Sequence, residues 1–348
     1  MKRFIDLFAG IGGFRIGFER NGFECVFTSE KNKYCQEIYE ANFGDIPFGD
    51  ITQIDPKEIP DFEVLLGGFP CQPFSISGKK QGFKDTRGTL FFDVCRIIEE
   101  KQPKVVVLEN VKHLIYHDKK NTLKTILASL EDLGYNVSKQ VLNAKDFGLP
   151  QNRERIFIIG CKKSYFDFNK LKKSTTPQLK TYLDTEGKFE YLEKSEYTLI
   201  DNPRKQPTGL IFVGYRNKNT WKTGVRPNTE HLSRVHRQPN RIYSVEGVHP
   251  TLPSQETSGR FFIYLPEIDK VRKLTINECY RIMGFPKKFK RHKRTGEQYK
   301  QIGNSVAISV IEVIAQQILK QGLLDEEPQT EITGNLQAPP LQLIMSKV

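Results

Sequence analysis

The 348-residue sequence lacks several features that would assign it to other classes of protein. It contains no apolar run of the length that a membrane-spanning helix needs. The basic and apolar start MKRFIDLFAGIGG is interrupted by Asp6 and is followed by no small-residue cleavage site of a signal peptide. No internal repeat is found. These absences predict a cytoplasmic protein that does not enter a membrane.

Cysteine is sparse and carries no pairing pattern. The six cysteines are scattered without a CxxC pair, which argues against both a disulfide framework and a structural zinc site. We therefore expect no metal, and at least one cysteine is a candidate for a reactive thiol. They are Cys25, Cys35, Cys71, Cys95, Cys161 and Cys279.

The charge is unevenly distributed along an otherwise ordinary composition. Hydrophobic residues make up 38% of the chain and charged residues 27%, which excludes disordered and collagenous classes. The formal net charge is +12, and residues 161–300 hold 29 Lys+Arg against 14 Asp+Glu. A merely solvated Lys-rich surface would spread over the whole chain. The concentration in one segment instead predicts a polyanionic partner, most simply nucleic acid.

The pattern of elements divides the chain into two lobes. Residues 1–161 alternate apolar strands (RFIDLF, ECVFTS, VLLGG, KVVVLE, RIFIIGC) with helical patterns near 14–21, 31–42, 90–101 and 121–133. This alternation predicts an α/β fold with a doubly wound, mostly parallel sheet. Residues 162–270 indicate a smaller lobe rich in β-strands and loops. Helical periodicity returns at 274–283 and, behind Gly303-Asn304, at 305–319, which predicts a return to the first lobe over 271–324. The tail 325–348 is expected to be flexible.

A glycine turn follows the first predicted strand, in FIDLFAGIGG at residues 4–13. Such a turn brings backbone close to a ligand at the carboxyl end of a strand, where open α/β sheets bind nucleotides. Glu30 ends the second strand and could bind ribose hydroxyls, and Asp50 could bind an adenine amino group in the same way. A plain tight turn is the alternative. The two acids at the ends of successive elements favour a nucleoside site.

Cys71 is the candidate nucleophile. It lies in GGFPCQPFS at residues 67–75, where Pro70 and Pro73 stiffen the loop and the two glycines allow a close approach to substrate. A thiol on a rigid, exposed loop suits nucleophilic attack. For the other five cysteines, buried packing is the expected role.

Charged side chains follow two further strands. Glu109, in ENV after the strand 104–108, is predicted at the same sheet edge as Cys71, although Asn110 could be a helix cap. In QNRER at 151–155, Arg153 and Arg155 are placed on one side of an incipient strand. Two guanidiniums there could hold a phosphate or a base carbonyl, with surface salt bridging as the alternative.

These four stretches, in this order, resemble motifs of the bacterial cytosine-C5 DNA methyltransferases of type II restriction-modification systems. RKLT at 272–275, MGFP at 283–286 and GNSV at 303–306 resemble later motifs of that family. The resemblance covers residues 3–160 and 270–320. It implies an S-adenosylmethionine-dependent, Rossmann-like catalytic domain at 1–161, a target-recognition domain at 162–270 and a return to the catalytic domain at 271–324.

The resemblance also implies a DNA (cytosine-5-)-methyltransferase that acts through a covalent adduct. Cys71 would add to C6 of a flipped-out cytosine, Glu109 would bond the protonated N3, Arg155 would orient O2 and Arg153 would contact a phosphate. S-adenosylmethionine would donate the methyl group and leave as S-adenosylhomocysteine. One departure is Lys31, which stands where members often carry an aromatic or apolar residue, so Ile51 is expected to supply the adenine packing. The implied cofactor residues are Phe8, Ala9, Gly10, Ile11, Gly12, Gly13, Glu30, Asp50, Ile51, Pro70, Asn304, Ser305 and Val306.

Double-stranded DNA is the implied partner, and the loop 75–88 is expected to close over it. A cognate restriction endonuclease would be a functional rather than a physical partner, and the enzyme is expected to be a monomer. The candidate DNA contacts are Ser75, Ser77, Lys79, Arg87, Arg216, Arg226, Arg234, Arg237, Arg241, Thr251, Gln255 and Arg260.

Three other functions are alternatives. A nicotinamide-dependent oxidoreductase would share the glycine turn but not PCQ, ENV or the basic lobe. An RNA methyltransferase of a related branch would largely lack the recognition lobe, whereas the stretch 162–270 is long here. A DNA-binding regulator with a dead site is disfavoured by the intact Cys71, Glu109, Arg153 and Arg155.

Overall fold

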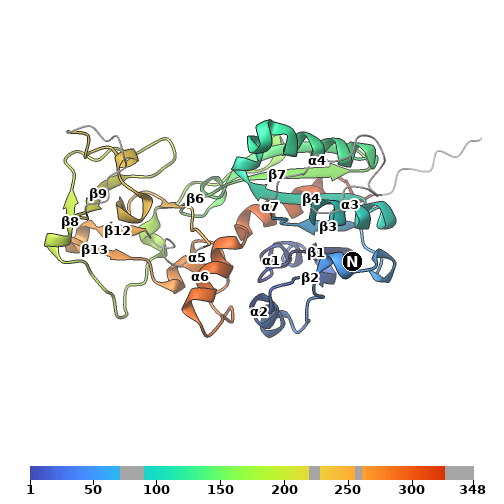
Figure 1. Cartoon of the computed structure of the whole chain (residues 1–348), viewed down its shortest axis with the longest axis horizontal. Coiled ribbons are helices and arrows are strands. Elements are labelled where there is room, and N and C mark those ends of the chain that lie inside the picture. Colours follow the sequence, from blue (N-terminus) through green and yellow to red (C-terminus); the bar gives the residue numbers. More distant parts are fainter. Residues whose placement is uncertain (71–89, 219–227, 255–260, 326–348) are drawn as a thin grey trace, which may run out of the picture.

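The structure is a computed structural model that describes residues 1–70, 90–218, 228–254 and 261–325. Figure 1 shows two lobes that meet near β6 (Gln151–Asn152) and α5 (Ile276–Arg281). One lobe is built on a large sheet and the other on a small one. The large lobe holds the N-terminal half of the chain and the last helix.

The large sheet has six strands in the order β2-β1-β3-β4-β7-β5. The first four are parallel to one another, whereas β7 is antiparallel to both β4 and β5. The predicted α/β fold is thereby confirmed, with β5 as a strand that was not predicted. The bounds are β1 Lys2–Leu7, β2 Phe23–Ser29, β3 Val64–Gly67, β4 Val105–Val111, β5 Asn136–Asn143 and β7 Glu154–Cys161.

Successive strand residues feed two separate hydrophobic cores, because side chains of a strand alternate between the faces of a sheet. Val105 and Val107 belong to one core, and Val106 and Leu108 to the other. Helices α1 (Gly13–Glu19) and α7 (Ile308–Lys320) cover the first face. Helices α3 (Leu90–Lys101) and α4 (Asn121–Asp132) cover the second. These strands are apolar on both faces, which is why they read as continuous hydrophobic runs.

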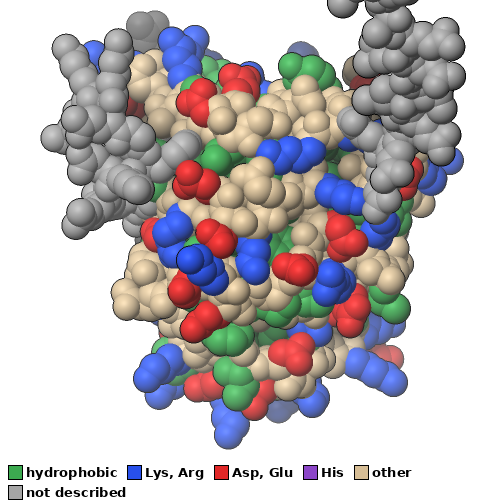
Figure 2. Space-filling model, turned by 90° about the vertical axis from the view of Figure 1, so that its right-hand side faces the viewer, with side chains coloured by type: hydrophobic (Ala, Val, Ile, Leu, Met, Phe, Trp, Pro, Cys, Tyr) green, Lys and Arg blue, Asp and Glu red, His purple; other side chains and the backbone are tan. Residues whose placement is uncertain are grey.

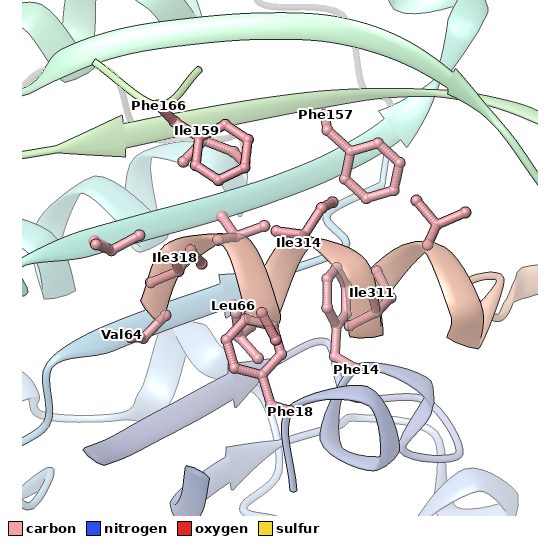
Figure 3. Close-up of a cluster of buried hydrophobic side chains, with 14 of the residues drawn as sticks. Phe14, Phe18, Val64, Leu66, Phe157, Ile159, Phe166, Ile311, Ile314 and Ile318 are labelled. Carbon is pink, nitrogen blue, oxygen red and sulfur yellow. The ribbon is translucent and has the colours of Figure 1, made fainter. Parts of the chain in front are cut away.

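Helix α7 lies in the centre of the first core. Figure 3 shows Ile311, Ile314 and Ile318 pointing into the cluster that α1 and the sheet strands form. Within the described part of the chain, the stretch Thr295–Lys320 is long and apolar enough by composition to cross a membrane, and 61% of its apolar 18-residue portion is buried inside the protein. Residues 305–307 interrupt it. We therefore interpret α7 as a core helix.

Ile314→Ala is expected to lower the free energy of unfolding by about 2–5 kcal/mol, because Ile314 is fully buried and its removal leaves a cavity in the first core. Urea unfolding followed by circular dichroism measures the change. Gln316→Ala, on the exposed side of the same helix, is the control and should change stability by less than about 0.5 kcal/mol. Equal effects of the two substitutions would contradict the placement of α7.

The small lobe carries a five-stranded sheet in the order β13-β12-β10-β9-β8. Only β10 and β12 pair in parallel. The chain passes between the lobes later than the predicted boundaries at residues 162 and 271. Phe166, Phe168 and Leu171 still pack in the core of the large lobe, and β13 still pairs with β12 in the small lobe. The bounds are β8 Tyr197–Leu199, β9 Phe212–Arg216, β10 Arg241–Ser244, β12 Phe262–Leu265 and β13 Lys270–Lys273.

The junction between the lobes contains a helix that the sequence did not reveal. Helix α6 (Thr295–Asn304) ends at Gly303-Asn304, and the last helix begins only at Ile308, so the prediction that this pair starts the last helix was wrong. Beside α6 lie α5 and α2 (Lys33–Phe43), which share a third hydrophobic core. The two-residue strand β6 pairs in parallel with β11 (His249–Pro250) and ties the lobes together.

Candidate active site

A cavity of about 470 Å³ lies at the carboxyl ends of β1, β3 and β4. Three of the predicted motifs line it from the sheet, and the paired arginines line it from the start of β7. The turn between α6 and α7 closes it on the side of the small lobe. The predicted site residues that line the cavity are Phe8, Ala9, Gly10, Gly13, Glu30, Pro70, Glu109, Arg153, Arg155, Asn304, Ser305 and Val306. The sheet edge therefore collects side chains that are far apart in the sequence, as expected for this architecture.

The glycine turn is held in a strained conformation. Gly10 and Gly12 have φ of 56° and 84°, and even Phe8 has φ of 60°, a value that costs energy for a residue with a side chain. A Cβ on Gly13 would lie 2.7 Å from Ser305 Oγ and 2.8 Å from Val306 Cγ2. The turn can pack against the α6–α7 junction only because position 13 is glycine.

Glu30 presents its carboxylate at this turn. Its Oε2 accepts a hydrogen bond from Gly10 N at 2.8 Å, and its Oε1 accepts one from Asn32 N at 2.7 Å. The backbone thus fixes the carboxylate at the cavity wall. Remaining lone pairs of an ionised carboxylate can still accept hydroxyl donors from a ligand.

Four predicted cofactor residues do not line the cavity. Ile11 and Ile51 are buried in the third and second hydrophobic cores, and Gly12 is the N-cap of α1 beside Phe43. Asp50 forms an ion pair with Lys31, Nζ to Oδ2 2.6 Å, and this hydrogen bond lowers the pKa of Asp50. Contacts of these four residues with a cofactor stay predictions.

Glu109 lies within β4, not after it, and is almost completely buried. Its Oε1 is 3.1 Å from Arg155 Nε. Burial raises the pKa of Glu109, and the charges of Arg155 and then Arg153 oppose that rise. A carboxyl whose pKa is raised keeps its proton to higher pH. This suits a group that must donate a proton to a ligand.

Arg153 is only 2% exposed, although it lines the cavity. Its guanidinium donates to the backbone carbonyls of Leu252 at 3.3 Å, Gly303 at 2.9 Å and Ser305 at 2.5 Å. Burial and then Arg155 lower the pKa of Arg153, although a guanidinium remains charged at neutral pH. A side chain committed to three carbonyls is poorly placed for the predicted phosphate contact.

The segment before the predicted nucleophile is anchored to β4. Asn110, which is buried, donates from Nδ2 to Phe69 O at 2.8 Å. Asn110 is therefore a loop anchor and not the helix cap that was considered as an alternative. Cys71 itself, with Ser75, Ser77, Lys79 and Arg87, lies outside the described residues.

Four of the other five thiols are poor candidates for a nucleophile. Burial raises the pKa of Cys25, Cys35 and Cys161 to about 12, and it raises that of Cys95 as well. These thiols are protonated at neutral pH, and a thiol attacks only as the thiolate. Cys35 nevertheless lines the cavity, so it is a useful control for Cys71.

Of the predicted DNA contacts, Arg234 and Arg237 have exposed side chains. Arg241 donates to His236 O, Arg216 pairs with Glu196 at 3.5 Å, and Thr251 Oγ1 donates to Asn152 O at 2.7 Å. Arg226, Gln255 and Arg260 lie outside the described residues. Figure 2 shows the far end of the large lobe, where the described Lys, Arg, Asp and Glu side chains intermingle.

Sequence reasoning missed the cavity residues that two helices supply. Asn32 and Cys35 come from the start of α2, and Glu297, Lys300 and Gln301 come from α6. The signal available in the sequence was the pair Tyr299 and Ile302, which are buried and spaced as on one face of a helix. Without α6, this wall of the cavity could not be foreseen.

The resemblance implies that Glu30 binds the ribose of the cofactor, so Glu30→Ala is expected to weaken binding of S-adenosylhomocysteine by about 10- to 100-fold, because about 1.5–3 kcal/mol is lost when a charged hydrogen-bond acceptor is removed. Isothermal titration calorimetry measures the dissociation constant. Glu24→Ala, an exposed position on β2, the strand that precedes Glu30, is the control and should leave binding unchanged. Unaltered affinity in Glu30→Ala would rule out Glu30 as a cofactor ligand.

Solved structures share this architecture at low sequence identity. The S. pombe Dnmt2 methyltransferase matches with a TM-score of 0.66 at 18% identity, over 92% of this chain and 99% of that one. A putative DNA modification methyltransferase encoded within an E. coli prophage matches with a TM-score of 0.65 at 22% identity, over 94% of this chain and 100% of that one. The fold is therefore that of a methyltransferase.

The family model of the C-5 cytosine-specific DNA methylases matches residues 2–320. The chain belongs to this family, and it is a DNA cytosine-C5 methyltransferase of the bacterial type II class. It is 44% identical to the type II methyltransferase M.HhaI of Haemophilus parahaemolyticus, over 91% of this chain and 94% of that protein. It is 41% identical to M.HpaII of Haemophilus parainfluenzae, over 91% of this chain and 89% of that protein. The predicted family, fold and enzyme class are confirmed.

Proposed function

We propose that the protein methylates C5 of a flipped-out cytosine within a specific sequence of double-stranded DNA, through a covalent adduct between Cys71 and C6. The observation that carries this proposal is the cavity at the sheet edge, in which Glu109 pairs with Arg155 beside the glycine turn. A protonatable carboxyl, a guanidinium and a nucleoside-binding turn meet there. Cytosine activation needs these groups together.

The cavity fits S-adenosylmethionine. Phe8 offers a ring for adenine and Glu30 a fixed carboxylate for the ribose, while Gly10, Gly13 and Pro70 leave room for the methionine portion against Asn304, Ser305 and Val306. A volume of about 470 Å³ is in the range of small-molecule sites. When bound, the cofactor supplies an electrophilic methyl group, and S-adenosylhomocysteine is the product.

The residues of the chain make C5 of cytosine nucleophilic. The Cys71 thiolate forms a bond from Sγ to C6, and the electrons of the C5–C6 double bond move toward C5. Glu109 holds a proton at N3, which accepts the negative charge that this addition would otherwise place on the ring. After C5 is methylated, loss of the C5 proton restores the double bond and releases Cys71. Arg155 orients the cytosine O2 from its place beside Glu109.

Access to both faces of the cytosine requires that the base leave the helix, which costs a few kcal/mol. The basic small lobe would offset this cost through contacts with phosphates and neighbouring bases. Arg234 and Arg237 are exposed there and are suited to this role. We propose residues 162–270 as the target-recognition region.

In the cell, the enzyme would protect host DNA from a restriction endonuclease that recognises the same sequence. The endonuclease would act separately, and the methyltransferase would act as a cytoplasmic monomer. Methylation of the recognition sequence removes the substrate of the endonuclease, so no stable complex between the two is required.

The proposal is tested by incubating the protein with tritium-labelled S-adenosylmethionine and unmethylated plasmid DNA, and then mapping 5-methylcytosine by bisulfite sequencing. Label at one short recurring sequence is the expected result. Label on transfer RNA but not on DNA would favour an RNA methyltransferase. Sequence-specific DNA binding without label would favour a regulator with a dead site.

A further inference from the structure

The lobes meet at a buried polar seam, which we define as Gln151, Arg153, Thr251 and Leu252. Gln151 is fully buried, accepts a hydrogen bond from Leu252 N at 3.1 Å and donates one to Ile282 O at 3.2 Å. Thr251 Oγ1 donates to Asn152 O at 2.7 Å. These bonds reinforce the short pairing of β6 with β11. Figure 1 shows β6 between the two lobes.

Arg153 differs from the other seam residues because its bonds reach the junction between α6 and α7. One of its donors bonds Leu252 O, which follows β11 on the side of the small lobe. The other bonds Gly303 O and Ser305 O, which belong to the α6–α7 junction. That junction lines the cavity, and its Ser305 faces Gly13 of the glycine turn. One guanidinium therefore joins the chain of the recognition region to the wall of the cofactor site.

The two segments that Arg153 joins are also in direct backbone contact. A Cβ on Gly303 would lie 2.1 Å from Pro253 O and 2.6 Å from Ser254 Cα. No side chain separates these backbones, so a shift of one segment displaces the other. The planar guanidinium holds its donors in a fixed geometry, which makes it sensitive to such a shift.

We propose that Arg153 is a positioning residue that couples the recognition lobe to the cofactor wall, so that DNA and S-adenosylmethionine bind cooperatively. This inference rests on the proposed function. A ligand that fixes either segment reduces the freedom of the other through the shared guanidinium, and the second ligand then binds to a partly ordered site. Such a coupling acts equally in both directions.

The coupling factor measures this effect directly. It is the dissociation constant of S-adenosylhomocysteine for the protein alone, divided by that for the protein saturated with an unmethylated duplex carrying the sequence found by bisulfite mapping. We expect about a tenfold factor or more in the native protein. In Arg153→Ala we expect it to fall to within about twofold of one. Arg153→Lys, which keeps the charge but not the fork, should lie between them.

Gln151→Met is the matched control, because it removes hydrogen bonds at the same seam but none to the cofactor wall. It should keep the native coupling factor, whereas general weakening of the seam would lower the factor in both variants. Thermal unfolding verifies that each variant is folded, and if Arg153→Ala is not, Arg153→Lys decides. A native factor in a folded Arg153 variant overturns the inference, as does an equal loss in Gln151→Met. Native protein that binds both ligands without coupling overturns the inference alone, whereas no binding of S-adenosylhomocysteine overturns the proposed function as well.

Discussion

Glu109→Gln is expected to lower the methylation rate by at least about 100-fold while DNA and cofactor still bind, because general acid catalysis typically contributes 10²–10⁴-fold. Glutamine has nearly the same shape and can still donate a hydrogen bond to N3, but it cannot hold the proton there. The single-turnover rate on a duplex that carries the target sequence measures the loss. The substitution therefore isolates the proton from the rest of the contact.

The control is Glu154→Gln. Glu154 lies on the neighbouring strand β7, pairs with Lys112 and does not line the cavity. Its rate should stay within about threefold of the native rate, since exposed ion pairs contribute little. A similar loss in both variants would point to an effect of net charge and not to the chemistry of Glu109.

The pH dependence of the native rate follows from the same group. Burial raises the pKa of Glu109, so its carboxyl keeps the proton at pH values where an ordinary glutamate has lost it. As the pH rises through that pKa, the protonated fraction falls and the rate should fall with it. Glu109→Gln does not ionise and should lose this limb of the profile. An identical limb in the variant would assign the titration to another group.

Cys71→Ser is expected to reduce turnover by at least about a thousandfold, because an alcohol is a far weaker nucleophile than a thiolate and the adduct to C6 no longer forms. Binding of duplex DNA, measured by fluorescence anisotropy, should persist because the hydroxyl replaces the thiol with little change in volume. Steady-state incorporation of tritium gives the rate.

Cys35→Ser provides a control within the same cavity. Burial raises the pKa of the Cys35 thiol to about 12, so it contributes no thiolate at neutral pH. Its turnover should stay within a few-fold of native. Normal turnover in Cys71→Ser, or loss of turnover in Cys35→Ser, would mean that the nucleophile has been assigned to the wrong cysteine.

The large sheet could be predicted because its strands are apolar on both faces and separated by helical patterns. Val105–Leu108 is an example, since each residue enters one of the two cores. Strand β5 was missed because it is half-buried, with Lys139 and Gln140 exposed, and so lacks the apolar run. Helix α6 was missed because its apolar positions are few and Gly303-Asn304 looked like the start of a helix when it is an end.

Glu109 and Glu30 could be located from sequence because each lies near the end of a strand, where the sheet itself determines the position. The orientation of Arg153 could not, since it depends on carbonyls more than ninety residues away in the chain, at Leu252, Gly303 and Ser305. Both arginines were expected to face a ligand. The structure brings only Arg155 into an ion pair with Glu109.

The most direct test of the account uses a duplex in which 5-fluorocytosine replaces the target cytosine. Release of the thiolate requires loss of the proton at C5. A fluorine in its place cannot be removed by a base, so the methylated adduct persists. With S-adenosylmethionine present, mass spectrometry should find one DNA strand and one methyl group attached to the protein, and peptide mapping should place the attachment at Cys71. Protein that methylates ordinary DNA but forms no such adduct, or attaches it at another residue, would contradict the account.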